Sequence, residues 1–357
     1  RFMVRTTVMP IRPKRVLVSL QVQTQKQTKL EGDHMSVSKN GYAKIFAATL
    51  FGIVLCSFGP FGLFAPAAFA FSYLSGSMRK TLLIQVTVLA LASFAFGKQF
   101  FLGGTGIFAI YATMIGGLLT FGIRKKFPPM AIILNVGGFL VLMASVFVGL
   151  FALSSDQSIY EVVLTNTQFY IEQLKNNKEF TQALSLGGEQ AILLKSLISS
   201  PEKIAVEIIS WTPTVFISGT FLSLWVSLYY VLRNSYSWRK KIDFPYGLVH
   251  LTYFKLPFQF VYLLIFGIVI VLASDYVNPH MATVGLNLIY AIGTLYFFQG
   301  FGVCYDFFVI KRIRGFFRSF SLMFILVFAW KAVVVVGLLD VWFNFRKYFL
   351  NKSEGDK

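Results

Sequence analysis

One lysine lies where a membrane-crossing segment would be most apolar. Lys331 stands near the middle of the run Phe320–Leu339. A lysine at the centre of a bilayer costs about 2.5–3.5 kcal/mol on insertion scales, so its ammonium should face the interior of a bundle and find an acid, a carbonyl group or water. The functional interpretation is a ligand anchor or an ion-path residue. The structural interpretation is an internal ion pair, or snorkelling if the span is shifted. The candidate acids are Asp275, Asp306 and Asp340.

Two amides lie inside apolar runs and complete the candidate site. Gln299 follows an aromatic stretch several residues inside its span, which makes it the easier partner for Lys331, and Asn287 lies in the same apolar run. Each amide could bond a ligand, although contact with a neighbouring helix is the commoner role of one such amide taken alone. Lys331, Gln299 and Asn287 are therefore the residues that we expect to bind a ligand in an internal cavity.

Other groups capable of chemistry are scattered. Cys56 and Cys304 lie in separate apolar runs, and His34, His250 and His280 are far apart in the chain. The glycine-rich stretch 103–106 is not followed by Gly-Lys-Ser/Thr and follows no strand, so it is not a phosphate-binding loop. We expect no catalytic residue, no metal, no cofactor and no enzymatic activity.

The composition indicates a lipid environment. Of the 357 residues 56% are hydrophobic and 13% are charged, whereas soluble domains carry about 25% charged residues. The net charge of +18 comes from short basic clusters between apolar runs, which is the spacing of cytoplasmic loops rather than of a nucleic-acid-binding surface. We expect the lipid bilayer as a partner and no nucleic acid. The clusters are Arg79-Lys80, Arg124–Lys126, Arg239–Lys241 and Lys311–Arg318.

A span needs about 20 apolar residues, and the chain offers seven clear runs. A longer run, Ile45–Tyr73, is broken at Gly59-Pro60 and predicts two short helices in a membrane-dipping hairpin. The predicted fold is all-α: a polytopic transmembrane helical bundle of about 8–9 membrane elements. The seven runs are Thr81–Phe96, Ile107–Ile123, Pro129–Leu153, Trp211–Leu232, Leu256–Ser274, Thr283–Cys304 and Phe320–Leu339.

Five segments follow from this pattern. Residues 1–40 are basic and either disordered or upstream of the true start, for which Met35 is the candidate; a mitochondrial presequence is a further interpretation. Residues 41–153 and 211–345 hold the N-terminal and C-terminal transmembrane helices, 154–210 form an extracytoplasmic amphipathic helical insertion, and 346–357 are a polar tail. With basic loops in the cytoplasm, Arg346-Lys347 would fall outside, so either the last span does not fully cross or the N-terminal count is wrong.

The C-terminal half carries a family resemblance. Lys255-Leu256-Pro257 opens one span, Gln299-Gly300 lies in the next, and the closing run Gly337–Lys347 reads GLLDVWFNFRK. This order resembles the YybS-like family of uncharacterised bacterial inner-membrane proteins, over roughly Lys44–Tyr348. The resemblance implies a multi-pass protein of a bacterial inner membrane and carries no activity.

The layout is also similar to the substrate-binding membrane subunits of energy-coupling-factor transporters, although it has more spans and a long outer insertion. We therefore expect a small-molecule-binding or transport component that works with a separate energising subunit, because the chain has no nucleotide-binding motif. The first alternative is a non-catalytic membrane scaffold, and the second is an intramembrane enzyme. A closed interior would favour the scaffold, and a cavity lined by the three candidate residues would favour binding.

Overall fold

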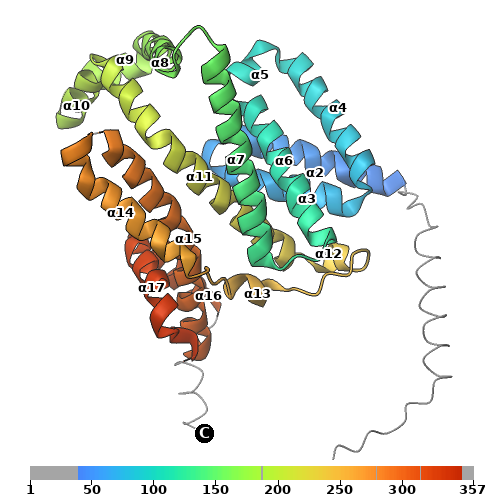
Figure 1. Ribbon diagram of the computed structural model, residues 1–357. Coiled ribbons are helices and arrows are strands. Elements are labelled where there is room, and N and C mark those ends of the chain that lie inside the picture. Colours follow the sequence, from blue (N-terminus) through green and yellow to red (C-terminus); the bar gives the residue numbers. More distant parts are fainter. Residues whose placement is uncertain (1–38, 186–187, 279, 314, 348–357) are drawn as a thin grey trace, which may run out of the picture.

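The fold was described from a computed structural model, which covers residues 39–185, 188–278, 280–313 and 315–347. Every regular element in these ranges is helical (Figure 1), which confirms the predicted fold class. Expectations about residues 1–38 lie outside the described part. Six helices are long and apolar enough to cross a membrane, and they correspond to six of the seven predicted runs: α4 (Met78–Phe96), α6 (Thr105–Arg124), α7 (Pro129–Ser154), α11 (Pro201–Arg233), α14 (Gln259–Val277) and α15 (His280–Ile310).

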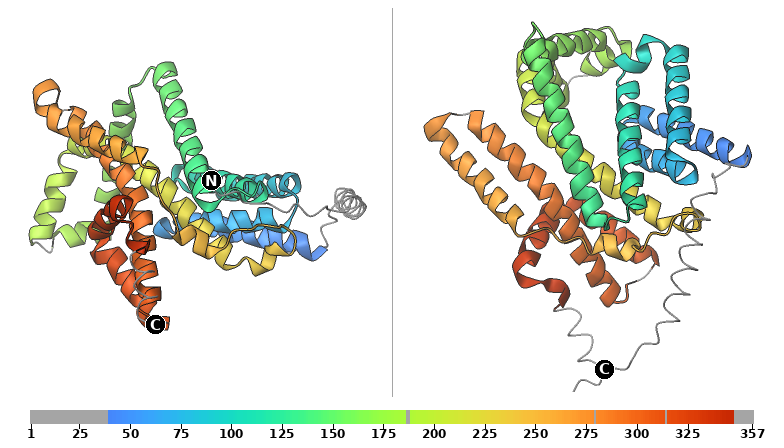
Figure 2. Two further views of the ribbon diagram at one scale, coloured as in Figure 1. Left: turned by 60° about the horizontal axis from the view of Figure 1, so that its bottom comes forward. Right: turned by 45° about the vertical axis from the view of Figure 1, so that its right-hand side comes forward.

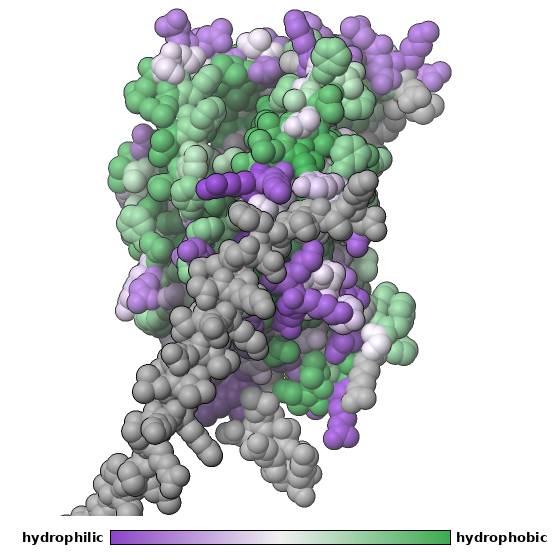
Figure 3. Space-filling model, turned by 90° about the vertical axis from the view of Figure 1, so that its right-hand side faces the viewer, coloured by the Kyte–Doolittle hydropathy of each residue, from purple (hydrophilic) through white to green (hydrophobic). Residues whose placement is uncertain are grey.

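The surface of these helices is predominantly apolar. In Figure 3 a broad green area lies between hydrophilic residues at the top and a second hydrophilic group lower down. Large apolar side chains are exposed on several of the long helices, among them Leu83, Phe147 and Phe266. A soluble protein rarely exposes a contiguous apolar patch of this kind, whereas lipid tails are an apolar solvent. The chain is a multi-pass membrane protein in contact with the bilayer.

The N-terminal segment forms the predicted hairpin. Helix α2 (Lys39–Ser57) packs against α3 (Ala65–Ser75), and the 3-10 turn η1 (Gly59–Phe64) joins them. Gly59 adopts a φ of +53°, in the region that favours glycine, and Pro60 has no N–H to continue α2. The tip of the hairpin reaches α11, where Ser223 Oγ donates to the carbonyl of Leu63 at 3.1 Å. Ser223 lies ten residues before the end of α11, about 15 Å along its axis, so the hairpin dips into the bundle.

The insertion between α7 and α11 consists of α8 (Ile159–Lys175), α9 (Lys178–Ser185) and α10 (Glu189–Ile198). A capping box starts α8: Ser158 Oγ accepts from the N–H of Glu161, and the Glu161 carboxylate accepts from the N–H of Ser158. Thr167 and Ile171 form the face of α8 that is buried, and α8 packs along α11. These helices lie at one end of the molecule (Figure 1). The expected insertion reached residue 210, but the helix that starts at Pro201 runs unbroken into the span, so 201–210 belongs to α11.

The seventh predicted run is not one straight helix, and it adds a seventh span only if its two bent halves are counted together as one span. Phe320–Leu339 divides into α16 (Gly315–Phe328) and α17 (Trp330–Phe343), which are bent by 94° at Ala329. Figure 2 shows these red helices folded beside the orange α14 and α15 instead of continuing across the molecule. The hydrophobic run was long enough for a span, but its second half packs closely on α15, and this tertiary contact decides its direction. The pair forms a broken or re-entrant element.

This bend removes the charge conflict at the C-terminus. The guanidinium of Arg346 donates to the carbonyl of Thr252 at 2.9 Å, in α13 (Leu248–Thr252), which follows α12 (Tyr236–Arg239) after the end of α11. Lys126, which follows α6, and Asp243, which lies between α12 and α13, form an ion pair at 2.6 Å. Figure 1 shows α12, α13 and α17 toward the end opposite to α8–α10. Arg346 therefore lies at the same end as the other basic loops, which we call the basic end.

The closing helix α17 ends at Phe343. It continues past Asp340 to Phe343, where Asn344 adopts a left-handed φ of 46° and stops it. Trp342 and Phe343 are exposed beyond the buried Asp340. The break at Asn344 separates these two aromatic side chains from Phe345–Lys347.

Candidate functional site

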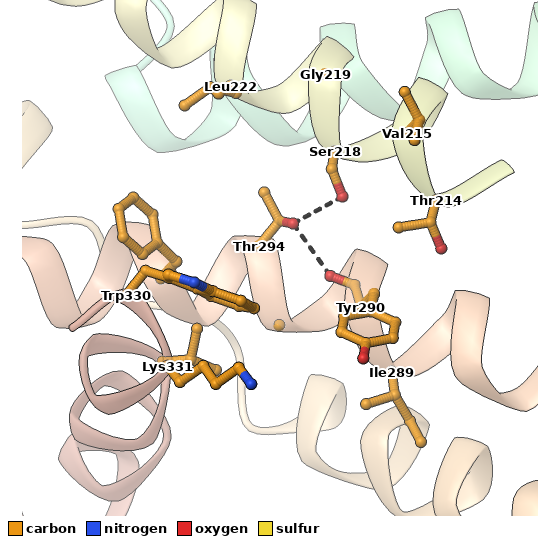
Figure 4. Close-up of a pocket in the computed structure, with 13 residues that line it drawn as sticks. Thr214, Val215, Ser218, Gly219, Leu222, Ile289, Tyr290, Thr294, Trp330 and Lys331 are labelled. Atoms are coloured by element: carbon orange, nitrogen blue, oxygen red, sulfur yellow. Dashed lines mark hydrogen bonds between the residues drawn. The ribbon is translucent and has the colours of Figure 1, made fainter. Parts of the chain in front are cut away.

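A cavity of about 750 Å³ lies between α11, α15 and the start of α17. Its size falls within the range of small-molecule sites, about 300–1,000 Å³. The walls are mostly apolar, and the polar groups come from separate helices (Figure 4). The described lining residues are Thr214, Val215, Ser218, Gly219, Leu222, Ile289, Tyr290, Gly293, Thr294, Phe297, Trp330, Lys331 and Val334. We call this space the Lys331 cavity.

Lys331 occupies the first turn of α17, immediately after the bend. Its ammonium extends into the space bounded by Trp330, Thr294 and Tyr290 (Figure 4) and lies 5.6 Å from the centroid of the Trp330 ring. It makes no hydrogen bond or ion pair with any residue that the structure describes, and none of the described lining residues is acidic. The expected direct partner on another span is absent from the described contacts.

The hydroxyl groups of the cavity are arranged between α11 and α15. Thr294 Oγ1 is hydrogen-bonded to Ser218 Oγ at 2.8 Å and donates to the carbonyl of Tyr290 at 3.0 Å. These bonds fix the two hydroxyls on the wall that Figure 4 shows above Lys331. The Tyr290 ring packs on Trp211 with centroids 5.5 Å apart. The cavity therefore presents one cation, fixed hydroxyl dipoles and aromatic rings.

Gln299 does not line this cavity. It is fully buried, its Oε1 accepts from the N–H of Leu256 at 2.9 Å, and its Nε2 donates to Asp340 Oδ2 at 3.1 Å. The amide thus joins α15 to α17 and to the chain that precedes α14. The expectation that Gln299 would be the partner of Lys331 is wrong, because other groups use both ends of its amide.

The side-chain amide of Asn287 is also engaged in hydrogen bonds within the fold. Its Oδ1 accepts from the N–H of Thr214 at 2.9 Å, and its Nδ2 donates to the carbonyl of Ser210 at 2.9 Å. An uninterrupted α11 would pair those two backbone groups with each other, but Pro213 lies between them and disturbs the ladder. The Asn287 amide bridges this opening, and its side chain lines only a small neighbouring space of about 140 Å³.

A buried polar cluster that the sequence analysis missed closes the basic end. Arg346 Nε lies 3.3 Å from Asp306 Oδ2, and its guanidinium also donates to the carbonyls of Thr252 and Gln299. Asp340 Oδ1 accepts from the N–H of Phe345 at 2.9 Å. On one continuous helix Asp340 and Arg346 would face different sides; the break at Asn344 turns Arg346 back toward Asp306. The sequence signal for this cluster was the spacing of the acidic Asp340 and the basic Arg346 in the closing run Gly337–Lys347.

Two comparisons with known proteins, one with curated proteins and one with solved structures, gave no match. A family model described as "Predicted membrane protein (DUF2232)" matches residues 45–341. The match covers the hairpin, all six long helices and the site-bearing α17 up to Val341. The chain therefore belongs to the DUF2232 family of predicted membrane proteins.

Proposed function

We propose that this protein binds a small anionic molecule in the Lys331 cavity and serves as the substrate-binding component of a membrane transport system. The observation that supports the proposal is an ammonium without an acidic partner in a cavity of about 750 Å³. Lys331 is exposed in the structure, so its ammonium is accessible to a ligand, and a bound anion would supply the opposite charge that the described lining residues lack. The ligand's charge is the property that this site selects.

The position of Lys331 adds a second electrostatic contribution. The N-terminus of a helix carries about half a positive charge from its unpaired N–H groups, and Lys331 is the second residue of α17. Both contributions favour an anion. The rest of the wall is formed by side chains such as Leu222, Ile289 and Val334, which suit an apolar body attached to the charged group.

Two broken elements support a role in transport. Carriers in membranes commonly bind ligands at interrupted helices near the middle of the bilayer. Here the α16–α17 bend carries Lys331, and the hairpin tip at Leu63 reaches the same turns of α11 near Ser223. The similarity to the substrate-binding subunits of energy-coupling-factor transporters is an argument from layout.

The cellular setting is part of the proposal. The basic end would face the cytoplasm of a bacterial inner membrane, in line with the YybS-like resemblance. A separate energising subunit would bind there, because the sequence carries no nucleotide-binding motif. In this proposal the protein holds its ligand and is not an enzyme.

The scaffold remains the second candidate, since the outer helices expose side chains such as Phe169 and Ile192 that a partner protein could cover. The open Lys331 cavity favours binding over a closed scaffold, although Gln299 and Asn287 are not among its described lining residues.

Native mass spectrometry of the protein purified from its membrane tests the proposal. Wild-type protein and the Lys80→Met control, which alters an exposed cation outside the cavity, should carry the same small anionic adduct. Lys331→Met should fold and insert but lose the adduct. An adduct retained on Lys331→Met would contradict the proposal.

A further inference from the structure

A second cavity of about 570 Å³ lies on the other side of α11, between η1, α6 and α11. No charged side chain occurs among its described lining residues. Its polar groups bond to one another: Tyr111 Oη and Thr220 Oγ1 are 2.5 Å apart, and Ser223 Oγ donates to Leu63. The surface left for a ligand is apolar. The lining residues are Leu63, Gly104, Ile107, Phe108, Tyr111, Val215, Phe216, Gly219, Thr220 and Ser223. We call this space the hairpin cavity.

The two cavities share Val215 and Gly219 of α11. Successive helical residues are rotated by about 100°, so positions 215 and 219 form one narrow stripe along α11. Ser218 and Leu222, which line only the Lys331 cavity, lie on one side of that stripe. Phe216 and Thr220, which line only the hairpin cavity, lie on the other side. The two spaces are therefore neighbours across a ridge and not separated by the full helix.

The ridge is low at Gly219, because this residue has no side chain. A Cβ built on Gly219 would meet no atom within 4 Å, so the space beside the helix is open there. Val215, one turn away, is 66% exposed, and in this bilayer-crossing part of α11 an exposed side chain borders lipid. A larger residue at position 219 would stand between the two cavities. Glycine instead leaves a low saddle, that is, a gap between the two cavities, which the extended alkyl chain of a ligand can cross.

We propose that the Lys331 cavity and the hairpin cavity form one groove for a single anionic amphiphile, with the charged head at Lys331 and the apolar chain lying over Gly219 toward Ile107 and Phe108. The asymmetry of the two spaces sets this orientation. The cation is at one end, and the apolar lining with internally bonded hydroxyls is at the other. This inference rests on the proposed function and specifies its ligand class.

A chain-length comparison tests the groove. The full chain is placed in phosphatidylcholine nanodiscs, and equilibrium binding of radiolabelled butyl phosphate and dodecyl phosphate is measured. Dodecyl phosphate should bind wild-type protein roughly tenfold more tightly or better, because its chain fills the apolar cavity. Partitioning into the disc also favours the longer chain, so the affinity ratio is compared among variants.

Three variants separate binding in the groove from partitioning into the bilayer. Gly219→Leu raises the saddle, and Ile107→Trp fills the hairpin cavity from a position that does not line the Lys331 cavity. Both should reduce the dodecyl-to-butyl ratio to the value set by partitioning, and Ile107→Trp should keep butyl phosphate binding. Gly138→Leu is the matched control, since Gly138 is an open helical glycine outside both cavities and should leave the ratio unchanged.

An unchanged ratio in both Gly219→Leu and Ile107→Trp would overturn the groove while leaving anion binding at Lys331 intact. Failure of the proposed function looks different, because then butyl phosphate would not bind wild-type protein or would bind Lys331→Met equally well. Phosphatidylglycerol in the nanodisc distinguishes the source of the amphiphile. If phosphatidylglycerol competes with dodecyl phosphate, the amphiphile is a bilayer lipid; if it does not compete, the amphiphile is a free molecule. Either result supports the groove only when the dodecyl-to-butyl affinity ratio also falls in Gly219→Leu and Ile107→Trp.

Discussion

Gly300 of α15 and Gly337 of α17 meet backbone to backbone. A Cβ on Gly300 would overlap the carbonyl of Val333, and a Cβ on Gly337 would overlap the carbonyl of Tyr296. Small residues let membrane helices approach this closely, and van der Waals packing then replaces the hydrophobic effect as the driving force. This crossing holds α17 against α15 and thereby places Lys331, six residues before Gly337, at the wall of the cavity.

Replacing Gly337 with valine should destabilise the protein by about 1–3 kcal/mol or more, since overpacking of a core costs that much and the obstructing atom here is backbone. Thermal unfolding in detergent, followed by intrinsic fluorescence, measures the change. Gly138→Val is the control, because a Cβ there meets nothing within 4 Å. Equal melting temperatures for the two variants would show that the helices do not cross at Gly337.

Gln299 and Asp340, whose side chains are hydrogen-bonded to each other near this crossing, should show energetic coupling. Gln299→Met and Asp340→Leu each leave a buried polar group of the other residue without its partner, at a cost of about 1–3 kcal/mol. The double variant should cost less than the sum of the two single variants. A double-mutant cycle in the same unfolding assay measures the difference, and strict additivity would mean that the two side chains are not in contact.

Asn287→Leu separates a structural amide from a ligand-binding one. The substitution removes the bridge between Thr214 and Ser210 beside Pro213, so the melting temperature should fall. Phosphate binding, measured below the melting transition, should persist with an affinity close to that of wild type. A stable Asn287→Leu protein that no longer binds would instead make the amide part of the site.

The bend before α17 makes a topological prediction. In a background with Cys56→Ala and Cys304→Ser, single cysteines are placed at Lys175, Ser237 and Lys347. In intact cells an impermeant thiol reagent should label only the Lys175 position, because the other two lie at the basic end. Labelling of the cysteines at both position 175 and position 347 would show that the last helix crosses the membrane.

Much of this fold follows from hydrophobic run length. The six long helices and the break at Gly59-Pro60 were predicted because bilayer thickness and proline chemistry act locally. The division of Phe320–Leu339 was not predictable in this way. Its cause is a tertiary contact between Gly300 and Gly337, and no local pattern places two distant glycines opposite each other.

The candidate site was predicted only in part. The cost of a lysine in the middle of an apolar run singled out Lys331, which does line a cavity, although the structure leaves it exposed. The same reasoning selected Gln299 and Asn287 by residue type, yet their partners are backbone groups and a carboxylate that come from other parts of the chain. A single sequence shows which amides must be satisfied but not which groups satisfy them.

The measurement closest to the central claim compares a charged and an uncharged ligand of equal length. Binding of dodecyl phosphate and dodecanol is measured for wild type, Lys331→Met and Lys331→Arg in phosphatidylcholine nanodiscs. Wild type should prefer the phosphate by roughly tenfold or more, in line with a charge-assisted contact worth about 1.5–3 kcal/mol. Lys331→Arg should keep the preference, and Lys331→Met should lose it while dodecanol binds as before. An undiminished preference for the phosphate in Lys331→Met would contradict the assignment of Lys331 as the anion-binding residue.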